Sequence, residues 1–341
     1  MSSFRLAVKD NIDVAGLPTT AGLQAFRNRI ATYDATIVAT LRAAGAQITG
    51  KTLMDEAAFG ALGDNPWYGR VHNPARHGYT CGGSSAGSAA AVASGEADLA
   101  LGTDTLGSVR IPASYCGVVG YVPGAGRLDM AGVTPLAPSF DRLGLFTRTL
   151  PEMVRFAGML FDHRSSASKT PSVSVLTNHP HCAQAAERLR RAGCRVTAIK
   201  AFDLSALRRA MLLQIEAEAA PALLPLPSLS EPLRAALEFG RNATPERLER
   251  AESTCAAARR TIQEWMKNDL LLLPSTPQSA FPFDGPVPSD QADYATLSSL
   301  LGLPAISVPA PVAAGKLPFG VQLVARAGED ARLLKAAALL A

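Results

Sequence analysis

Residues that mark metal sites and disulfide frameworks are scarce in this chain of 341 residues. It has only five histidines and five cysteines, and the odd number of cysteines suits free thiols. No two histidines have i,i+4 spacing in a helical context, and the cysteines lack metal-ligand spacing. We therefore expect a reducing compartment, no metal and no cofactor.

Long apolar runs are also missing. No stretch approaches the ~18 apolar residues of a membrane-spanning helix. The first ten residues, MSSFRLAVKD, lack the apolar core of a secretory signal. The net charge is only +4 and is spread along the chain, without the dense basic block that indicates nucleic-acid binding. We expect a cytoplasmic protein that binds neither membrane nor nucleic acid.

Apolar residues, by contrast, make up 48% of the chain, which is typical of a globular protein with a large core. Strand and helix patterns alternate along most of the sequence. Predicted strands cover residues 4–8, 47–49, 117–122, 172–176, 195–201, 270–273, 305–308 and 320–324. Predicted helices cover residues 34–44, 53–59, 85–93, 182–192, 204–219, 228–268 with a break near 240–244, and 330–340. This alternation favours an α/β fold with helices on both faces of a sheet.

Neither an internal repeat nor a low-complexity linker divides the chain. We expect a single domain over residues 1–341, with a sheet core from about 1–150 and 269–341. The segment between them, about 151–268, is expected to be a helical and α/β elaboration of that core.

The most informative stretch is residues 81–117, CGGSSAGSAAAVASGEADLALGTDTLGSVRIPASYCG. It contains two glycine–serine loops, in which Ser84 and Ser108 are separated by 24 positions. Such loops can place hydroxyl groups beside free backbone N–H groups. Nucleophilic acyl transfer needs that arrangement.

A phosphate loop is one alternative, because GAQITGKT at residues 45–52 fits the pattern G-x-x-x-x-G-K-[ST]. A phosphate loop follows a strand and leads into a helix. Gly45 instead ends a predicted helix, and residues 47–49 are the best local strand. We therefore interpret Gly45 as a helix C-cap and Lys51 as structural, and keep nucleotide binding only as a rival hypothesis.

A nucleophile elbow is a second alternative, because GSSAG at residues 83–87 fits G-x-S-x-G. That motif needs an apolar strand before it, and residues 76–81 are not apolar. It also needs an aspartate and then a histidine downstream, yet the last histidine is His181. A hydrolase built on these serines needs a different base.

Lys9 is a candidate for that base. It follows the apolar residues 6–8 and precedes Asp10 and Asn11. A single lysine at the end of a strand is usually a solvated surface residue. The motifs that accompany Lys9 give it a different interpretation.

Several motifs occur along the chain in one characteristic order. They are AVKDN (7–11), GKTLMDE (50–56), GGSSAGS (82–88), GTDTLGSVR (102–110), IPASYCG (111–117), GVTP (132–135), SFD (139–141), GLPAISVP (302–309) and LPFGVQL (317–323). The set resembles the amidase signature family and covers most of residues 5–148 and 270–340. Within that family, the short N-terminus and the stretch at 139–148 are similar to indole-3-acetamide-type amidases.

The resemblance implies a large mixed, mostly parallel sheet flanked by helices on both faces and truncated at the N-terminus. It also implies a Ser–cis-Ser–Lys triad. In that triad Ser108 is the nucleophile, Ser84 the bridging serine and Lys9 the base. The peptide bond between Gly83 and Ser84 is then expected to be cis, and Lys51 belongs to a different motif.

The loop before the nucleophile is expected to form the oxyanion hole with its backbone N–H groups. Its members are Thr105, Leu106, Gly107 and Ser108. Ser85, Asp104 and Arg110 are expected to support the site, the last two as an ion pair. Leu106 stands where the family usually has glycine, so a positive φ there would strain this residue.

The function that the resemblance implies is a cofactor-free amidohydrolase. It would cleave a small carboxamide or arylacetamide to a carboxylate and ammonia or an amine through a serine acyl-enzyme. The expected partner is the amide substrate, and a homodimer is the assembly that the resemblance allows. The alternative is an inactive or partner-dependent protein of the amidotransferase A-subunit type.

Overall fold

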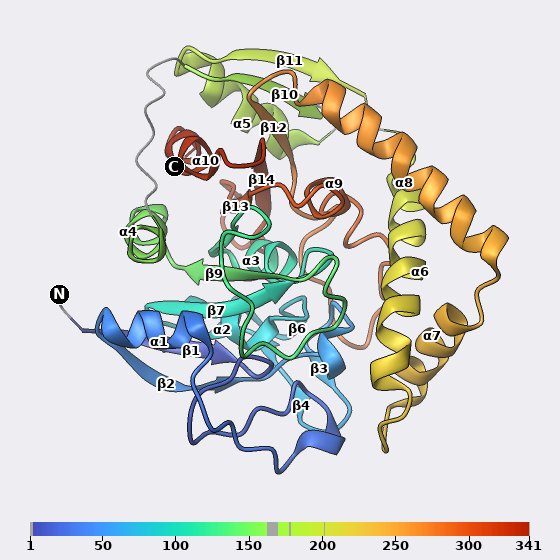
Figure 1. The fold of residues 1–341 in the computed structure, drawn as a ribbon. Coiled ribbons are helices and arrows are strands. Elements are labelled where there is room, and N and C mark those ends of the chain that lie inside the picture. Colours follow the sequence, from blue (N-terminus) through green and yellow to red (C-terminus); the bar gives the residue numbers. More distant parts are fainter. Residues whose placement is uncertain (1–2, 162–169, 177–178, 201, 341) are drawn as a thin grey trace.

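The computed structural model describes residues 3–161, 170–176, 179–200 and 202–340. Its centre is a ten-stranded sheet with the order β11-β10-β12-β14-β13-β8-β9-β7-β1-β2 (Figure 1). These strands are β1 (Phe4–Lys9), β2 (Ala46–Thr52), β7 (Leu99–Asp104), β8 (Val119–Val122), β9 (Arg142–Thr147), β10 (Ser172–Leu176), β11 (Arg195–Ile199), β12 (Leu270–Pro274), β13 (Ala305–Pro309) and β14 (Gly320–Ala325). Two small hairpins accompany the sheet: β3 (Asp64–Asn65) with β4 (Gly69–Arg70), and β5 (His72–Asn73) with β6 (Arg76–Thr80). Residue 201, at the end of the predicted strand 195–201, lies outside the described residues.

The sheet is mixed, as the sequence predicts, but parallel pairing does not predominate. In the described part of the chain, β1 is parallel to β2 and β7, and β10 is parallel to β11 and β12. The other five neighbouring pairs are antiparallel. The expectation of a mostly parallel sheet is wrong in that detail, because the chain reverses between β8 and β9 and between β13 and β14 without a crossover helix.

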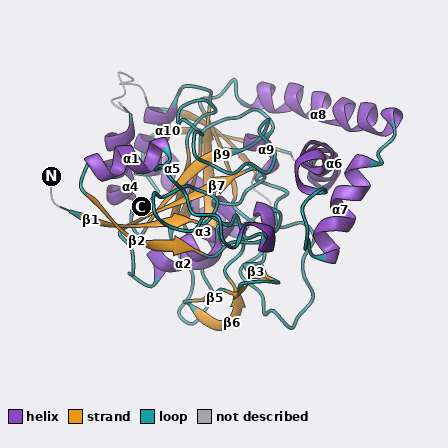
Figure 2. Cartoon of the chain, turned by 60° about the horizontal axis from the view of Figure 1, so that its bottom comes forward, coloured by secondary structure: helices purple, strands orange, loops and turns teal. Residues whose placement is uncertain are grey.

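Helices cover both faces of the sheet (Figure 2). One face carries α1 (Thr36–Ala43), α4 (Leu150–Leu160), α5 (Pro180–Arg191) and α10 (Asp330–Ala337). The other face carries α2 (Ala86–Ala93), α3 (Arg110–Cys116), α6 (Leu204–Leu223), α7 (Glu231–Arg241) and α8 (Pro245–Trp265). Strand β12 shows the cause: Leu270 and Leu272 join the first core cluster, whereas Leu271 and Leu273 join the second. A continuous apolar run thus serves two buried faces.

One predicted helix is almost absent. Residues 53–59 contain only the short 3₁₀ turn η2 (Glu56–Ala58), in which Ala57 and Ala58 have φ values of 53° and 61°. The Asp55 carboxylate accepts hydrogen bonds from the N–H groups of Leu62 and Gly63. These bonds hold a turn that a continuous helix could not form, so the predicted helix is wrong here.

The middle of the chain contributes both to the sheet and to a separate helical layer. Strands β10 and β11 extend the sheet at one edge, and α6, α7 and α8 form a group beside it (Figure 1). Helix α6 begins at Leu204 and is capped by Asp203, whose side chain accepts a hydrogen bond from the N–H group of Ala206. Within the described residues, no helix combines the length and the apolar character needed to cross a bilayer.

Close packing between α6 and α7 yields a prediction about stability. Gly240 of α7 lies against α6, where an added Cβ would come within 2.4 Å of the Glu216 carbonyl carbon. We expect Gly240→Ala to lower the free energy of unfolding by about 1–3 kcal/mol, because the two helices must move apart. Urea denaturation followed by circular dichroism measures this change.

The matched control is Gly158→Ala, since Gly158 is an exposed glycine inside α4. That variant should gain up to about 1 kcal/mol, because alanine is the better helix former. Equal stabilisation by both substitutions would contradict the close contact at Gly240.

Candidate active site

Lys9 is the last residue of β1 and is completely buried. Strand β1 lies between β2 and β7, and the Lys9 side chain is enclosed within the fold rather than solvated. The Lys9 ammonium nitrogen, Nζ, lies 2.8 Å from the Ser84 hydroxyl oxygen and 2.8 Å from the Thr103 hydroxyl oxygen. The usual solvated position of a lysine at a strand end therefore does not apply here.

Burial changes the protonation of this lysine. It lowers the pKa of Lys9 from 10.5 to about 7, although the charges of Asp55, Asp141 and Asp104 oppose the shift. Burial also raises the pKa of Asp55 to about 6, although hydrogen bonds from the N–H groups of Gly63 and Leu62 oppose this shift. Near neutral pH, a large fraction of Lys9 is thus a neutral amine that can accept a proton.

The Gly83–Ser84 peptide bond is cis, as the sequence predicts. Its glycine has no room for a side chain, because a Cβ on Gly83 would lie 2.0 Å from a carboxylate oxygen of Asp55. The carbonyl oxygen of Ser84 accepts a hydrogen bond from the Asp55 N–H group. Asp55 therefore packs on one side of the serine loop and holds it in place.

Ser108 lies on the second serine loop, with 8% of its surface exposed. The two loops are joined by the Ser85 N–H group, which donates to the carbonyl oxygen of Ser108 at 3.2 Å. The Ser85 hydroxyl donates to the carbonyl oxygen of Thr103. Within the described residues, no hydrogen bond links the hydroxyl groups of Ser84 and Ser108. The structure thus brings Lys9 and Ser84 into direct contact, with Ser108 on the adjoining loop.

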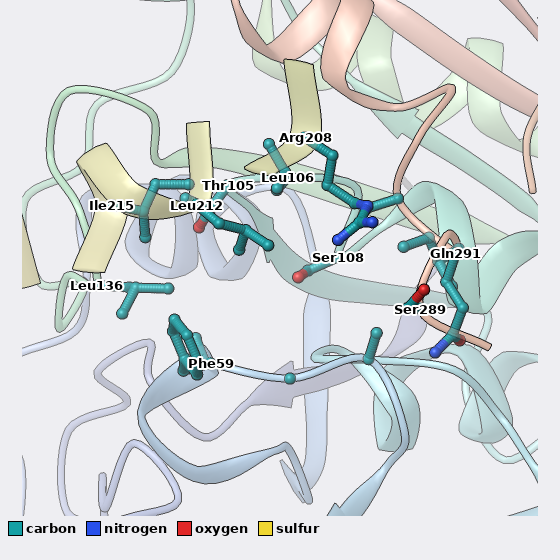
Figure 3. A pocket seen from close by; sticks show the side chains of 15 residues that line it. Phe59, Thr105, Leu106, Ser108, Leu136, Arg208, Leu212, Ile215, Ser289 and Gln291 are labelled. Atoms are coloured by element: carbon teal, nitrogen blue, oxygen red, sulfur yellow. The ribbon is translucent and has the colours of Figure 1, made fainter. Parts of the chain in front are cut away.

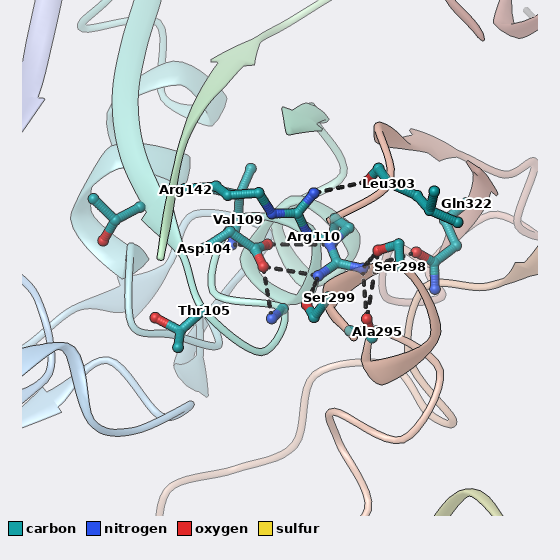
Figure 4. Close-up of polar contacts among 12 residues, drawn as sticks. Asp104, Thr105, Val109, Arg110, Arg142, Ala295, Ser298, Ser299, Leu303 and Gln322 are labelled. Carbon is teal, nitrogen blue, oxygen red and sulfur yellow. Dashed lines mark hydrogen bonds and ion pairs between the residues drawn. The ribbon is translucent and has the colours of Figure 1, made fainter. Parts of the chain in front are cut away.

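Asp104 and Arg110 form a fully buried ion pair behind the Ser108 loop, 2.7 Å between Oδ1 and Nη2 (Figure 4). The Asp104 carboxylate also accepts hydrogen bonds from the N–H groups of Gly107 and Val109. Burial alone would raise the pKa of Asp104, but the Arg110 charge and hydrogen bonds hold that pKa well below its usual range. The carboxylate therefore stays ionised and fixes the loop.

Arg110 connects this loop to the C-terminal part of the chain. It donates to the carbonyl oxygen of Ala295 and to the hydroxyl groups of Ser298 and Ser299 on α9 (Thr296–Ser299). It also contacts the side-chain oxygen of Gln322 on β14. Residues nearly 190 positions apart in sequence thereby hold the loop that carries Ser108.

The N–H groups expected to form an oxyanion hole are not equally available. The Gly107 N–H group is already bound to Asp104 at 2.8 Å. Those of Thr105, Leu106 and Ser108 donate to no acceptor in the described part of the chain. Leu106 has no positive φ; Gly107 is the left-handed residue of the loop, at φ 114°. The expected strain at Leu106 is therefore absent.

Sequence reasoning missed several residues that surround the site. The Thr103 hydroxyl contacts both Lys9 and the side-chain amide of Asn11. The Asp141 carboxylate accepts a hydrogen bond from the Thr105 hydroxyl and from two N–H groups of residues 136–137. Asn11, Thr103 and Asp141 all lie inside motifs quoted above. Their membership of a motif was the sequence signal that could have identified them.

A pocket of about 180 Å³ opens beside Ser108 (Figure 3). Most of its lining is apolar, with Phe59, Leu106, Ile111, Leu136, Leu212 and Ile215 among the side chains. Helix α6 supplies Arg208 as well as Leu212 and Ile215. Ser289 and Gln291 come from the segment after β12. None of these α6 or post-β12 residues was predicted, because they lie outside the recognised motifs.

The phosphate-loop hypothesis does not fit the observed backbone. Residues 46–52 form strand β2, where a phosphate loop would need a turn leading into a helix. The Lys51 ammonium donates to the Pro18 carbonyl oxygen and the Thr19 hydroxyl, and pairs with Asp10 at 3.3 Å. Lys51 is thus structural. Among the described residues, no three His, Cys, Asp or Glu side chains are grouped to hold a metal ion.

The sequence of this chain is similar to those of known amidase-related proteins. The Amidase family profile matches residues 5–220 and 224–334. The indoleacetamide hydrolase of Pseudomonas syringae pv. syringae is 48% identical over 161 residues, which cover 47% of this chain and 36% of that protein. The chain thus spans only about a third of that relative's length. The A subunit of the Thermus thermophilus glutamyl-tRNA(Gln) amidotransferase is 34% identical over 99% of this chain and 84% of that protein.

Solved structures of related proteins have a similar fold. A crystal structure of an amidase superimposes with a TM-score of 0.88 at 31% identity and covers 99% of this chain and 83% of that one. The Kluyveromyces lactis allophanate hydrolase has a TM-score of 0.88 at 26% identity, over 99% of this chain and 61% of that one. The fold is therefore shared across the length of this chain.

The buried ion pair gives a second stability prediction. We expect Asp104→Ala to lower the free energy of unfolding by about 3–5 kcal/mol, because it leaves the Arg110 charge buried without an opposite charge. Chemical denaturation measures the change. The control is Glu187→Gln, which removes a half-exposed partner of Arg191 and should cost less than about 1 kcal/mol. A comparable small loss for both variants would refute the bracing role of Asp104.

Proposed function

The chain belongs to the amidase signature family, and we propose that it is an amidohydrolase. It would cleave a small carboxamide to a carboxylate and ammonia or an amine through an acyl-enzyme on Ser108. One observation carries this proposal: the buried Lys9 amine lies 2.8 Å from the Ser84 hydroxyl, on the loop that adjoins Ser108.

The first half-reaction forms the acyl-enzyme. Neutral Lys9 accepts the proton of the Ser84 hydroxyl, while Ser84 takes the proton of the Ser108 hydroxyl. The Ser108 oxygen attacks the amide carbonyl carbon, and the carbonyl electron pair moves onto oxygen. In this proposal, substrate binding closes the contact between the two serine hydroxyls, as happens when catalytic hydrogen bonds tighten in the Michaelis complex.

The second stage expels the amine. The proton held on Lys9 returns through Ser84 to the amide nitrogen, the C–N bond breaks, and ammonia or an amine leaves. Water then attacks the ester carbon and gives up a proton through the same relay, which releases the carboxylate and restores the Ser108 hydroxyl. Lys9 thus acts first as base and then as acid.

The oxyanion of both tetrahedral species would be stabilised by backbone N–H groups. Thr105, Leu106 and Ser108 offer such groups without a protein acceptor in the described structure, and these three are the proposed donors. Each donor of this kind is worth about 3–4 kcal/mol of barrier. Because the Gly107 N–H group is bound to Asp104, we assign it a positioning role instead.

The second candidate is an amidase-like protein that works only with a partner. It is favoured by the similarity to the Thermus thermophilus amidotransferase protein over 99% of this chain. For the hydrolase itself, we propose a homodimer as the assembly.

All five cysteines are buried free thiols, which supports a reducing compartment such as the cytoplasm.

Replacement of the nucleophile tests the proposal. Wild-type protein should be labelled covalently by a fluorophosphonate, whereas Ser108→Ala should not be labelled and should lose at least about 10³-fold in amide turnover. Intact-mass spectrometry and ammonia release from an amide panel measure both. Ser94→Ala is the control, since Ser94 lies at the C-cap of α2. Absence of label on wild-type protein alone, with label appearing when a partner protein is added, would favour the second candidate.

The pH dependence tests Lys9. Because burial lowers the pKa of Lys9 to about 7, the reactive neutral form is lost as the pH falls below this value. The rate of fluorophosphonate labelling should fall about tenfold per pH unit below pH 6 and level off above pH 8. A rate that does not vary between pH 5.5 and pH 9 would exclude Lys9 as the base.

A further inference from the structure

The substrate pocket contains a charged group that the proposed chemistry leaves unused. Of the described residues that line it, only Arg208 carries a charge at neutral pH. Arg208 projects from α6 into the same space as Ser108 (Figure 3). It is distinct from the buried Arg110, whose hydrogen bonds all go to protein acceptors. Arg208 therefore faces the interior of the pocket that Ser108 also borders.

The Arg208 guanidinium is held in one orientation by Asp293. Its Nε donates to Asp293 Oδ1 at 2.7 Å, and the Ser205 hydroxyl donates to the other carboxylate oxygen at 2.6 Å. The side chains of Arg208 and Asp293 are each only 12% exposed. A planar group fixed along one edge loses little further freedom when a ligand binds to its other edge.

The Arg208 guanidinium has hydrogen-bond donors that no described protein group uses. A guanidinium has five N–H groups, and Asp293 takes the one on Nε. The N–H groups on the two Nη atoms meet no acceptor in the described part of the chain. The neighbouring Gln291 is engaged elsewhere: its side-chain oxygen accepts from the Tyr115 hydroxyl, and its amide donates to the Pro288 carbonyl. These N–H groups are therefore free to bind an acceptor on a ligand that displaces water from the pocket.

A carboxylate is the complementary group. Its two oxygens match two parallel N–H groups, one from each Nη, and the charge assists both hydrogen bonds. The pocket walls nearby are apolar, with Leu212 and Ile111 among them, so a neutral hydrocarbon there would leave these donors dry and unpaired. The Asp293 carboxylate accepts from Nε, so it leaves the Nη N–H groups to the ligand.

We propose that Arg208 binds a carboxylate at the far end of the acyl group, which makes the substrate a short monoamide of a dicarboxylic acid. This inference rests on the proposed function, since it takes Ser108 as the point of attack. Both residues border one pocket of about 180 Å³, so the acyl chain between them is short. Malonamate and succinamate have this form, whereas indole-3-acetamide lacks the carboxylate.

The experiment compares succinamate with its neutral counterpart butanamide. Wild-type protein should show a kcat/KM that is about tenfold to a hundredfold higher for succinamate. Arg208→Gln should remove this preference, because it should raise KM for succinamate much more than it changes KM for butanamide. Arg208→Lys keeps the charge but not the paired donors, and should restore the preference only in part.

Arg209→Gln is the matched control. Arg209 is the next residue of α6, but it lines a different hollow with Glu216 and Arg247, on the side facing α8. That variant should keep the succinamate preference of the wild type. Equal kcat/KM values for succinamate and butanamide in the wild type, or equal losses in the Arg208 and Arg209 variants, would overturn the proposal.

A binding measurement keeps this test separate from catalysis. Succinate, the product of succinamate hydrolysis, should bind to the wild type and to Ser108→Ala about tenfold or more tightly than butanoate, by calorimetry. Arg208→Gln should lose that difference. Selective binding of succinate, without amide turnover or fluorophosphonate labelling, would contradict the proposed hydrolase activity and leave the Arg208 assignment standing. Amide turnover with no selectivity for carboxylates would overturn the Arg208 assignment and leave the hydrolase proposal standing.

Discussion

Burial of a single lysine is the constraint on which the rest of the site depends. Lys9 ends a strand that pairs with β2 on one side and β7 on the other. In the described part of the chain, its amine is hydrogen-bonded to the hydroxyl oxygens of Ser84 and Thr103 and the carbonyl oxygen of Thr103. In water this amine would be charged and useless as a base. Removal from water makes the neutral form accessible near pH 7. The sheet therefore supplies chemistry as well as support.

A second constraint joins the two ends of the chain. The Ser108 loop is fixed by Asp104, Asp104 is neutralised by Arg110, and Arg110 is bound by α9 and β14. The C-terminal motifs near residues 302–323 contribute no proposed reacting group. In this structure they supply β13 and β14 of the sheet, and Gln322 contacts Arg110.

Local sequence predicted some features of the backbone and missed others. The cis peptide at Ser84 agrees with the expectation, and β1 extends one residue beyond the predicted strand 4–8, to Lys9. The helix at 53–59 was wrong, because the Asp55 carboxylate captures N–H groups from residues 62–63 and bends the chain. The parallel character of the sheet was overestimated, since helix–strand alternation does not record which strands become neighbours. The catalytic roles of Lys9, Ser84 and Ser108 stay predictions.

The sequence by itself determined the family, the class of fold and the residues proposed for the chemistry, because those residues lie in short motifs whose spacing is visible along the chain. Tertiary structure decided the burial of Lys9, which backbone N–H groups of residues 105–108 lack a protein acceptor, and which side chains line the pocket beside Ser108. Each of these depends on what lies across the fold: the dry interior around β1, the carboxylate of Asp104, and Arg208 on a helix 100 positions after Ser108. Spacing along a chain carries no record of such distances.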